Sequence, residues 1–98
     1  MYKVTFSSSC SKQLAKLKKN NQISESELII IRTWVKEMAL LGPDYMASCS
    51  HWNDHELKDN RSGERSSSFS ESGRIIYKVK KGKIEVCVVK ITPEHDYR

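Results

Sequence analysis

The fold is decided by residues 74–91, whose sequence is RIIYKVKKGKIEVCVVKI. Two runs rich in β-branched residues, 74–79 and 84–91, flank Lys81-Gly82, a pair that suits a tight turn between antiparallel strands. The second run is the most apolar segment of the chain, so it is predicted to be a central strand of a sheet. This stretch therefore predicts a β-hairpin against which the rest of the chain must pack.

The residues just before this hairpin continue the alternation with a period of two. Residues 64–69 are predicted to form a serine-rich strand, and residues 70–73 supply the turn that follows it. Residues 44–63 show no sustained period and are predicted to form a long loop with room for a helical turn. Long loops in compact domains are often functional.

The N-terminal residues predict a strand and then a helix. Residues 2–6 alternate as a half-buried strand. Residues 7–9 are serines that can cap a helix, which Asn20 and Asn21 would end. The apolar stripe of this helix consists of Cys10, Leu14 and Leu17.

The second helix has the clearest start and stop signals. Ser24 and Glu27 form a capping box, and Gly42-Pro43 is predicted to end the helix. Its apolar stripe is Leu28, Ile31, Val35 and Met38. The predicted order of elements is β-α-α-β-β-β.

Length and composition indicate one folded domain that spans residues 1–98. Apolar residues make up 38% and charged residues 30%, which is too apolar for a disordered chain. No run of 18 apolar residues exists, so no membrane span is expected. The first six residues do not resemble a signal peptide, because polar residues follow at once.

The net charge of +5 is concentrated in two segments. Both are nearly free of acidic residues, and their cations are Lys12, Lys16, Lys18, Lys19, Arg74, Lys78, Lys80, Lys81, Lys83 and Lys90. Clustered cations attract polyanions and release counterions on binding, so a nucleic acid or an acidic protein is the expected partner class. A lysine-rich surface that serves only solubility would look the same.

The three cysteines, Cys10, Cys49 and Cys87, have no paired spacing. Free thiols in a reducing cytosol are the simplest interpretation, so a cytoplasmic location is expected. The spacing of Cys49, His51 and His55 could offer three ligands to zinc, but it lacks the second cysteine pair of a structural site. We expect no metal and no other cofactor.

Three histidines stand out in so short a chain, namely His51, His55 and His95. Cleavage of RNA without a metal needs a base to activate the 2′-hydroxyl and an acid to protonate the departing 5′-oxygen, and the pKa of histidine suits both roles. Arginine can stabilise the phosphorane, and an aromatic ring can stack on a base. The sequence offers all three kinds of residue, although a single loop histidine is more often simply solvated.

Other conspicuous residues are more typical of structure than of chemistry. Trp34 lies near the apolar stripe of the second helix and is expected in the core, whereas Trp52 in the polar loop fits either a core or a binding role. Residues 66–68 are serines without the G-x-S-x-G context of an activated nucleophile, so they fit an edge strand better.

The C-terminal half resembles the RelE/ParE toxin superfamily, most closely its YoeB and YafQ branches. The resemblance rests on residues 73–79, a hairpin, residues 84–86 and the terminal residues 95–97, HDY. Upstream, residues 54–58 (DHELK) followed by Gly63 resemble the D-H-x-L-K segment of the YafQ branch. The order of elements also agrees, but only the part from residue 54 onward is specific.

This resemblance implies a ribosome-dependent mRNA endonuclease with four catalytic residues. His55 matches the catalytic histidine of the YafQ segment, and Arg74 matches the phosphate-contacting arginine that opens the R-[IL]-[IV]-Y strand. His95 and Tyr97 stand where the YoeB branch ends in a histidine and a tyrosine, although Asp96 separates them here. His55 and His95 are the expected acid–base pair, and the sequence leaves open which is which.

Four basic residues are expected to bind the RNA backbone beside this pair, namely Lys58, Arg61, Arg65 and Lys78. Many RelE relatives carry a further arginine on the serine-rich strand, where this chain has Ser67 or Ser68. Arg65 lies near the position of that arginine, but the sequence does not show which face of the strand its side chain occupies.

The fold implied is α+β and RelE-like, with two N-terminal helices packed on one face of a four-stranded, mainly antiparallel sheet. The other face and the loop of residues 44–63 would form the RNA cleft. The expected partners are a cognate acidic antitoxin, the ribosome and its mRNA, with no membrane involved. Two alternatives stay open: a ParE-type gyrase poison, which would need no histidines, and a basic nucleic-acid-binding module.

Overall fold

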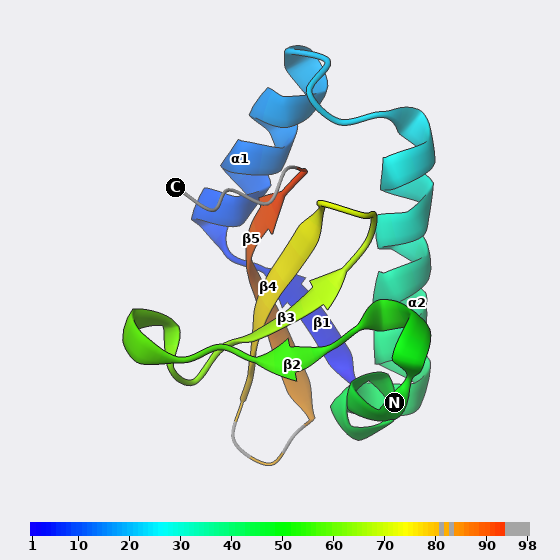
Figure 1. The fold of residues 1–98 in the computed structure, drawn as a ribbon, viewed down its shortest axis with the longest axis vertical. Helices are drawn as coiled ribbons and strands as arrows, with labels where there is room; N and C mark the ends of the chain where they lie inside the picture. Colours follow the sequence, from blue (N-terminus) through cyan, green and yellow to red (C-terminus); the bar gives the residue numbers. More distant parts are fainter. Residues whose placement is uncertain (81, 83, 94–98) are drawn as a thin grey trace.

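The computed structural model describes residues 1–80, 82 and 84–93 (Figure 1). The elements follow in the order β1 (Lys3–Phe6), α1 (Ser8–Lys19), α2 (Glu25–Ser48), β2 (His55–Glu56), β3 (Arg65–Ser68), β4 (Arg74–Val79) and β5 (Glu85–Thr92). Two short 3-10 helices, η1 (Ser50–Trp52) and η2 (Asp59–Arg61), lie before and after β2. Within the described residues, no helix is long and apolar enough to cross a membrane.

The strands form one sheet with the order β1-β5-β4-β3-β2. Strands β2 to β5 pair in antiparallel fashion, whereas β1 runs parallel to β5. The predicted number of strands, four, was therefore wrong, because the sheet has five. The sheet is mainly antiparallel, as predicted, but the parallel pairing of β1 with β5 makes it mixed. Strand β2 has two residues, too few to show alternation, and the pairing of β1 with β5 joins opposite ends of the chain.

Strand β5 lies inside the sheet, between β1 and β4, as its apolar sequence predicts, although β4 holds the middle place. The register places Tyr77 opposite Val88 and Ile76 opposite Lys90, so Val89 is an extra residue on β5. This β-bulge allows Val88 and Ile91, three residues apart, both to be buried in the core.

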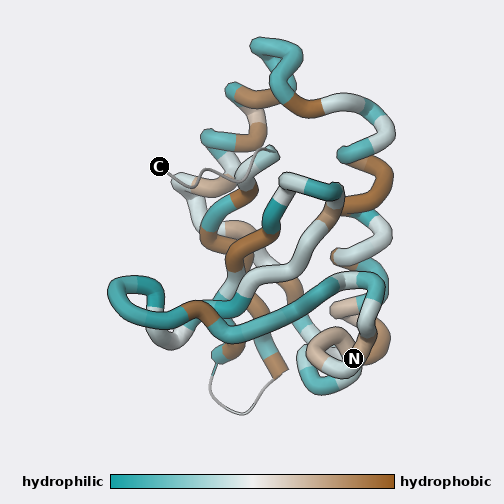
Figure 2. The backbone as a smooth tube through the Cα atoms, viewed as in Figure 1, coloured by the Kyte–Doolittle hydropathy of each residue, from teal (hydrophilic) through white to brown (hydrophobic). Residues whose placement is uncertain are grey.

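Side chains from both helices and from alternate positions of the strands form one core. Trp34 of α2 is fully buried, as predicted, and packs edge-on against Tyr77 of β4 with ring centroids 5.2 Å apart. Trp52 is also buried, and its indole Nε1 donates to Glu37 Oε1 at 2.8 Å. The other strand side chains in this core are Ile75, Val86, Val88 and Ile91. Figure 2 shows hydrophobic residues along α2, β4 and β5, whereas the segment around β2 is mostly hydrophilic.

Both helices begin at the predicted caps. The Ser7 hydroxyl accepts a hydrogen bond from the Cys10 amide at 3.1 Å. Ser24 and Glu27 form the reciprocal capping box, with distances of 3.1 and 2.8 Å. These serines satisfy backbone amides that a helix start would otherwise leave unpaired, which is why the signal was readable from sequence.

The second helix is interrupted at Gly42-Pro43, where the sequence predicted its end, but a further helical segment follows directly. Helical structure continues to Ser48 across a kink at Gly42, which has φ 86° and ψ 170°. Pro43 lacks an amide hydrogen and suits the first position of the segment that follows. The Tyr2 ring lies against Gly42, where a Cβ atom would come within 2.5 Å of it, and the Tyr2 amide donates to Ala39 O at 2.8 Å. The kink therefore leaves room for the Tyr2 ring, so that the residue just before β1 packs against α2.

Substitution Gly42→Ala should lower the free energy of unfolding by about 2–4 kcal/mol, because it adds backbone strain and a clash with Tyr2. Gly63→Ala is the matched control, since Gly63 has φ +93° but no atom within 4 Å of an added Cβ. It should cost only about 1–2 kcal/mol of strain. Urea unfolding of both variants measures the difference, and equal losses would contradict the role of Tyr2.

A second prediction concerns Cys10, whose burial, with a smaller effect of Cys87, raises its thiol pKa from 9.0 to about 11. The unfolded chain then loses this proton before the folded chain does, so stability that is complete below pH 9 is lost as the pH rises toward 11. The stability advantage of the wild type over Cys10→Ala should shrink by about 2–3 kcal/mol across that range. Urea unfolding at pH 8 and pH 11 measures it, and a constant advantage would contradict the expectation.

Candidate active site on the outer face of the sheet

The sheet has two faces with different chemistry. The inner face carries Ile75 and Tyr77, which belong to the core, and strand alternation points their neighbours to the other side. We call this other side the outer face. By the strand register it carries His55, Ser66, Ser68, Arg74, Ile76, Lys78 and Lys90. Two of the predicted catalytic residues, His55 and Arg74, thus share one face.

His55 begins β2, pairs with Ser66 of β3, and is exposed. Its Nδ1 atom lies 3.1 Å from the backbone oxygen of Asn53. A carbonyl oxygen can only accept, so this bond places a hydrogen on Nδ1 and leaves Nε2 of the neutral ring unprotonated. In this tautomer His55 is able to accept a proton on Nε2.

Arg74 begins β4 and is half-buried. Its Nη1 atom donates to Gly73 O at 2.9 Å and to Glu71 O at 3.2 Å, which holds the guanidinium at the turn before the strand. Among the described residues, no carboxylate pairs with this cation and no acceptor engages Nη2 or Nε. The positive charge is thus available to an anionic ligand.

The register also gives the spacing between these two side chains. His55 lies in the row of Ser66 and Ile76, and Arg74 lies two residues farther along β4. Two strand spacings across and two residues along place their Cα atoms about 12 Å apart. The two residues therefore lie on the same face of the sheet, two strands apart.

Two of the four predicted RNA-binding residues, Arg61 and Lys78, lie near the carboxylate of Glu64. Glu64 pairs with Arg61, and its Oε2 atom lies 3.9 Å from Lys78 Nζ. Lys58, which precedes η2, is exposed. Glu64 therefore partly compensates the charge of two of these cations, whereas Lys58 has no ion pair within the residues that the structure describes.

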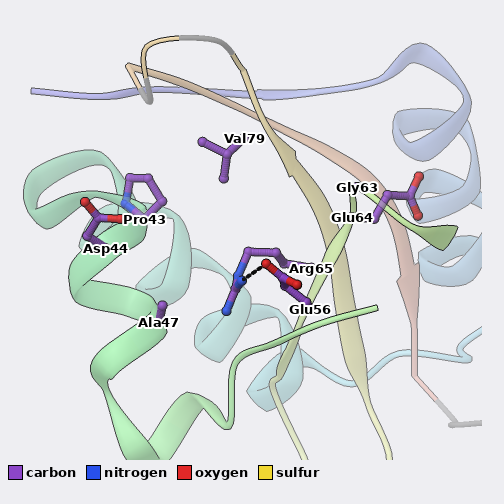
Figure 3. A pocket seen from close by; sticks show the side chains of 8 residues that line it. All are labelled: Pro43, Asp44, Ala47, Glu56, Gly63, Glu64, Arg65 and Val79. Atoms are coloured by element: carbon purple, nitrogen blue, oxygen red, sulfur yellow. Dashed lines mark ion pairs between the residues drawn. The ribbon is translucent and has the colours of Figure 1, made fainter. Parts of the chain in front are cut away.

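Arg65 lies on the inner face, opposite Tyr77. Its Nε atom donates to Asp54 Oδ1 at 2.7 Å, and its Nη1 atom lies 3.6 Å from Glu56 Oε1. It lines a cleft of about 270 Å³ between the end of α2 and the sheet, with Asp44, Glu56 and Glu64 among the other lining residues (Figure 3). Three carboxylates make this cleft a poor match for a polyanion, so the outer face is the better candidate for RNA.

The carboxylate of Asp54 is the centre of a buried polar network. Its side chain is 0% exposed and accepts hydrogen bonds from Arg65 Nε, from Ser67 Oγ at 2.6 Å and from the Tyr77 hydroxyl. Burial, and then the hydrogen bond to Asp54, raise the pKa of Tyr77 well above its ordinary value of 10.0. Tyr77 thus stays a neutral donor to the carboxylate.

His51 belongs to a different cluster from His55. Cys49 Sγ lies 3.0 Å from His51 Nδ1, and His51 Nε2 lies 3.9 Å from Glu37 Oε1. The part of the chain that the structure describes holds no group of three His, Cys, Asp or Glu side chains arranged to bind a metal ion. The possible zinc ligands Cys49, His51 and His55 are therefore not gathered into one site.

The other two predicted catalytic residues, His95 and Tyr97, lie outside the described residues. Sequence reasoning missed Asp54, Ser67 and Tyr77 as members of the polar network. Asp54 stands directly before His55 in the motif, and Arg65 and Ser67 share a face by their spacing of two, but neither pattern says which face is buried.

No protein-family model matches the sequence, and no curated protein matches it. Solved structures do share its fold. The chain is similar to YoeB in the YoeB-YefM complex from Staphylococcus aureus, with 18% identity, 99% of each chain covered and a TM-score of 0.67. It is also similar to the YoeB/ParE toxin from Agrobacterium tumefaciens, with 13% identity, 97% and 99% covered and a TM-score of 0.69. YafQ from E. coli gives 18% identity, 93% and 91% covered and a TM-score of 0.64. The chain therefore shares the fold of these YoeB, YafQ and YoeB/ParE proteins, as the sequence resemblance predicted.

Proposed function

We propose that this chain is the toxin of a type II toxin–antitoxin module and that it cleaves mRNA bound to the ribosome in the cytoplasm. The observation that carries the proposal is the placement of His55 and Arg74 on one face of a RelE/ParE-type sheet. An imidazole with a free Nε2 and a guanidinium that has no ion pair within the described residues are the groups that a phosphodiester transesterification needs.

In the proposed reaction His55 Nε2 removes the proton from the 2′-hydroxyl, and the 2′-oxygen attacks the adjacent phosphorus. Arg74 stabilises the charge that builds on the non-bridging oxygens. The bond to the 5′-oxygen breaks, and a proton from His95 neutralises this leaving group, while Tyr97 orients the nucleotide. The products are a 2′,3′-cyclic phosphate and a 5′-hydroxyl, with no atom drawn from a cofactor.

The RNA backbone would run across the outer face, where Lys58, Arg61 and Lys78 flank the reacting phosphate. Arg65 faces Asp54 and Glu56 instead, so its proposed contribution to RNA binding is indirect. A cognate acidic antitoxin would cover this face, a role that the complex of the similar YoeB with YefM supports.

A second candidate function is that of a non-enzymatic poison of DNA gyrase, because one similar structure carries the name YoeB/ParE. A gyrase poison has no need of imidazoles at His55 and His95. Activity that survives the loss of both would favour this alternative.

Substitution His55→Ala or His95→Ala should lower the rate of single-turnover cleavage by about 100- to 10,000-fold, since each removes a proton-transfer group. Arg74→Ala should cost a comparable factor through lost charge stabilisation. The measurement is cleavage of mRNA on programmed ribosomes, with ribosome affinity determined in parallel and expected to change little.

The matched control for these variants is His51→Ala. His51 is exposed and lies beside Cys49 and Glu37, away from the outer face, so its removal should leave cleavage nearly unchanged. If His51 proves essential while His55 and His95 do not, the proposed site is wrong.

The antitoxin should protect Arg74 and Lys58 from chemical modification. Phenylglyoxal and acetylating reagents react with exposed arginine and lysine, and mass spectrometry of the toxin alone and in complex compares their extents. Lys12 and Lys16 on α1 serve as the internal control and should stay reactive. Protection confined to α1, or failure of the two proteins to co-purify at moderate salt, would contradict the proposed partner surface.

A further inference from the structure

We propose that Asp54 is a positioning residue, whose buried carboxylate fixes β2 on β3 and so holds His55 on the outer face. The inference rests on the proposed function only in taking His55 as the group that is positioned. Asp54 is a titratable side chain with 0% exposure that the proposed reaction does not use.

The three donors to Asp54 come from two neighbouring strands of the inner face. Arg65 and Ser67 lie two residues apart on β3, and Tyr77 lies opposite Arg65 on β4. Their polar atoms converge on one carboxylate that has no contact with solvent. A buried carboxylate is stable only where a counter-charge and hydrogen-bond donors meet it, so these three side chains define where Asp54 must sit.

The position of His55 follows from this anchor by strand alternation. Asp54 points to the inner face, so the next residue, His55, points to the outer face, where it pairs with Ser66. A shift of one residue in the register of β2 would turn His55 toward the core. The carboxylate therefore selects both the register and the face of the catalytic histidine.

Backbone hydrogen bonds alone stabilise the pairing of β2 with β3 only weakly. The strand has two residues at the edge of the sheet, and it continues into a single further hydrogen bond from the Leu57 amide to Glu64 O at 2.9 Å. Edge pairs this short are marginal without side-chain support. Glu56 also faces Arg65, but its side chain is 78% exposed, so solvent screens that ion pair.

The test compares Asp54→Asn with the matched control Glu56→Gln, since both remove one negative charge facing Arg65. The first measurement is amide hydrogen exchange. Exchange at Leu57 should become about tenfold faster in Asp54→Asn, with the amides of β5 unchanged, whereas Glu56→Gln should exchange like the wild type.

The second measurement is a double-mutant cycle on cleavage. Asp54→Asn should lower the single-turnover rate about 10- to 100-fold without loss of ribosome affinity, as expected for a displaced catalytic group. Added to His55→Ala, it should have almost no further effect, because the residue it positions is already gone.

The outcomes separate the inference from the proposed function. An unchanged Leu57 amide, equal effects of the two charge variants, or rate losses that multiply with His55→Ala would each overturn the role of Asp54. If His55→Ala cleaves like the wild type, the proposed function fails, and the exchange measurement still decides whether Asp54 anchors β2. If Asp54→Asn does not fold, Ser67→Ala removes only one donor, and an unchanged Leu57 amide in that variant overturns the inference.

Discussion

The alternation of side chains along β4 is the constraint on which the rest of the structure depends. This strand holds the middle of the sheet, and its residues divide strictly between the two faces. Ile75 and Tyr77 point inward and meet the core, where Tyr77 packs against Trp34 of α2. Arg74 and Ile76 point outward. The same alternation, passed on through β3, sends Ser67 and Ser66 to opposite sides, so one strand sets both the core and the chemical face.

The inner face also shows how a charge can be buried at the edge of an apolar core. Removing a carboxylate from water is costly, and one partner rarely offsets that cost. Here Asp54 meets a cation and two hydroxyl donors, and Tyr77 links this group to the aromatic contact with Trp34. A slipped register of β2 would move the Asp54 carboxylate away from these three donors, so the network disfavours such an arrangement.

The parts of the fold that could be predicted from sequence are those with local signals. Capping serines, the alternation of β4 and the apolar run of β5 each reside in a few consecutive residues. Strand β2 is too short to alternate, and the parallel pairing of β1 depends on residues more than eighty positions away. Gly42-Pro43 does interrupt the helix, as predicted, but this pair does not reveal that a further helical segment follows, because proline also suits the first position of a helix.

The candidate site likewise contains residues that the sequence indicates and residues that only the structure reveals. A motif marks His55 and Arg74 in the sequence as candidate residues, and the register places them on one face, but their roles stay a prediction. The role of Asp54 could not be predicted, because its partners are spread over two strands and the sequence does not reveal which face they share. Arg65 illustrates the same limit, since a basic residue beside a predicted site can serve a buried carboxylate rather than the substrate.

The distribution of charge on the outer face bears on why the proposed reaction would need the ribosome. Among the described residues, the outer-face cations Arg74 and Lys90 have no ion pair, whereas Lys78 lies near Glu64, which also pairs with Arg61. Each phosphate contact releases roughly one counterion on binding, so a face with few unpaired cations gains little sequence-independent affinity for RNA. In the proposed reaction such a face would contribute little to holding a flexible RNA strand in line for attack. If the ribosome already holds the mRNA in place, the entropic cost of ordering the strand is removed. The outer face would then need only to engage one phosphate with Arg74 and one hydroxyl with His55.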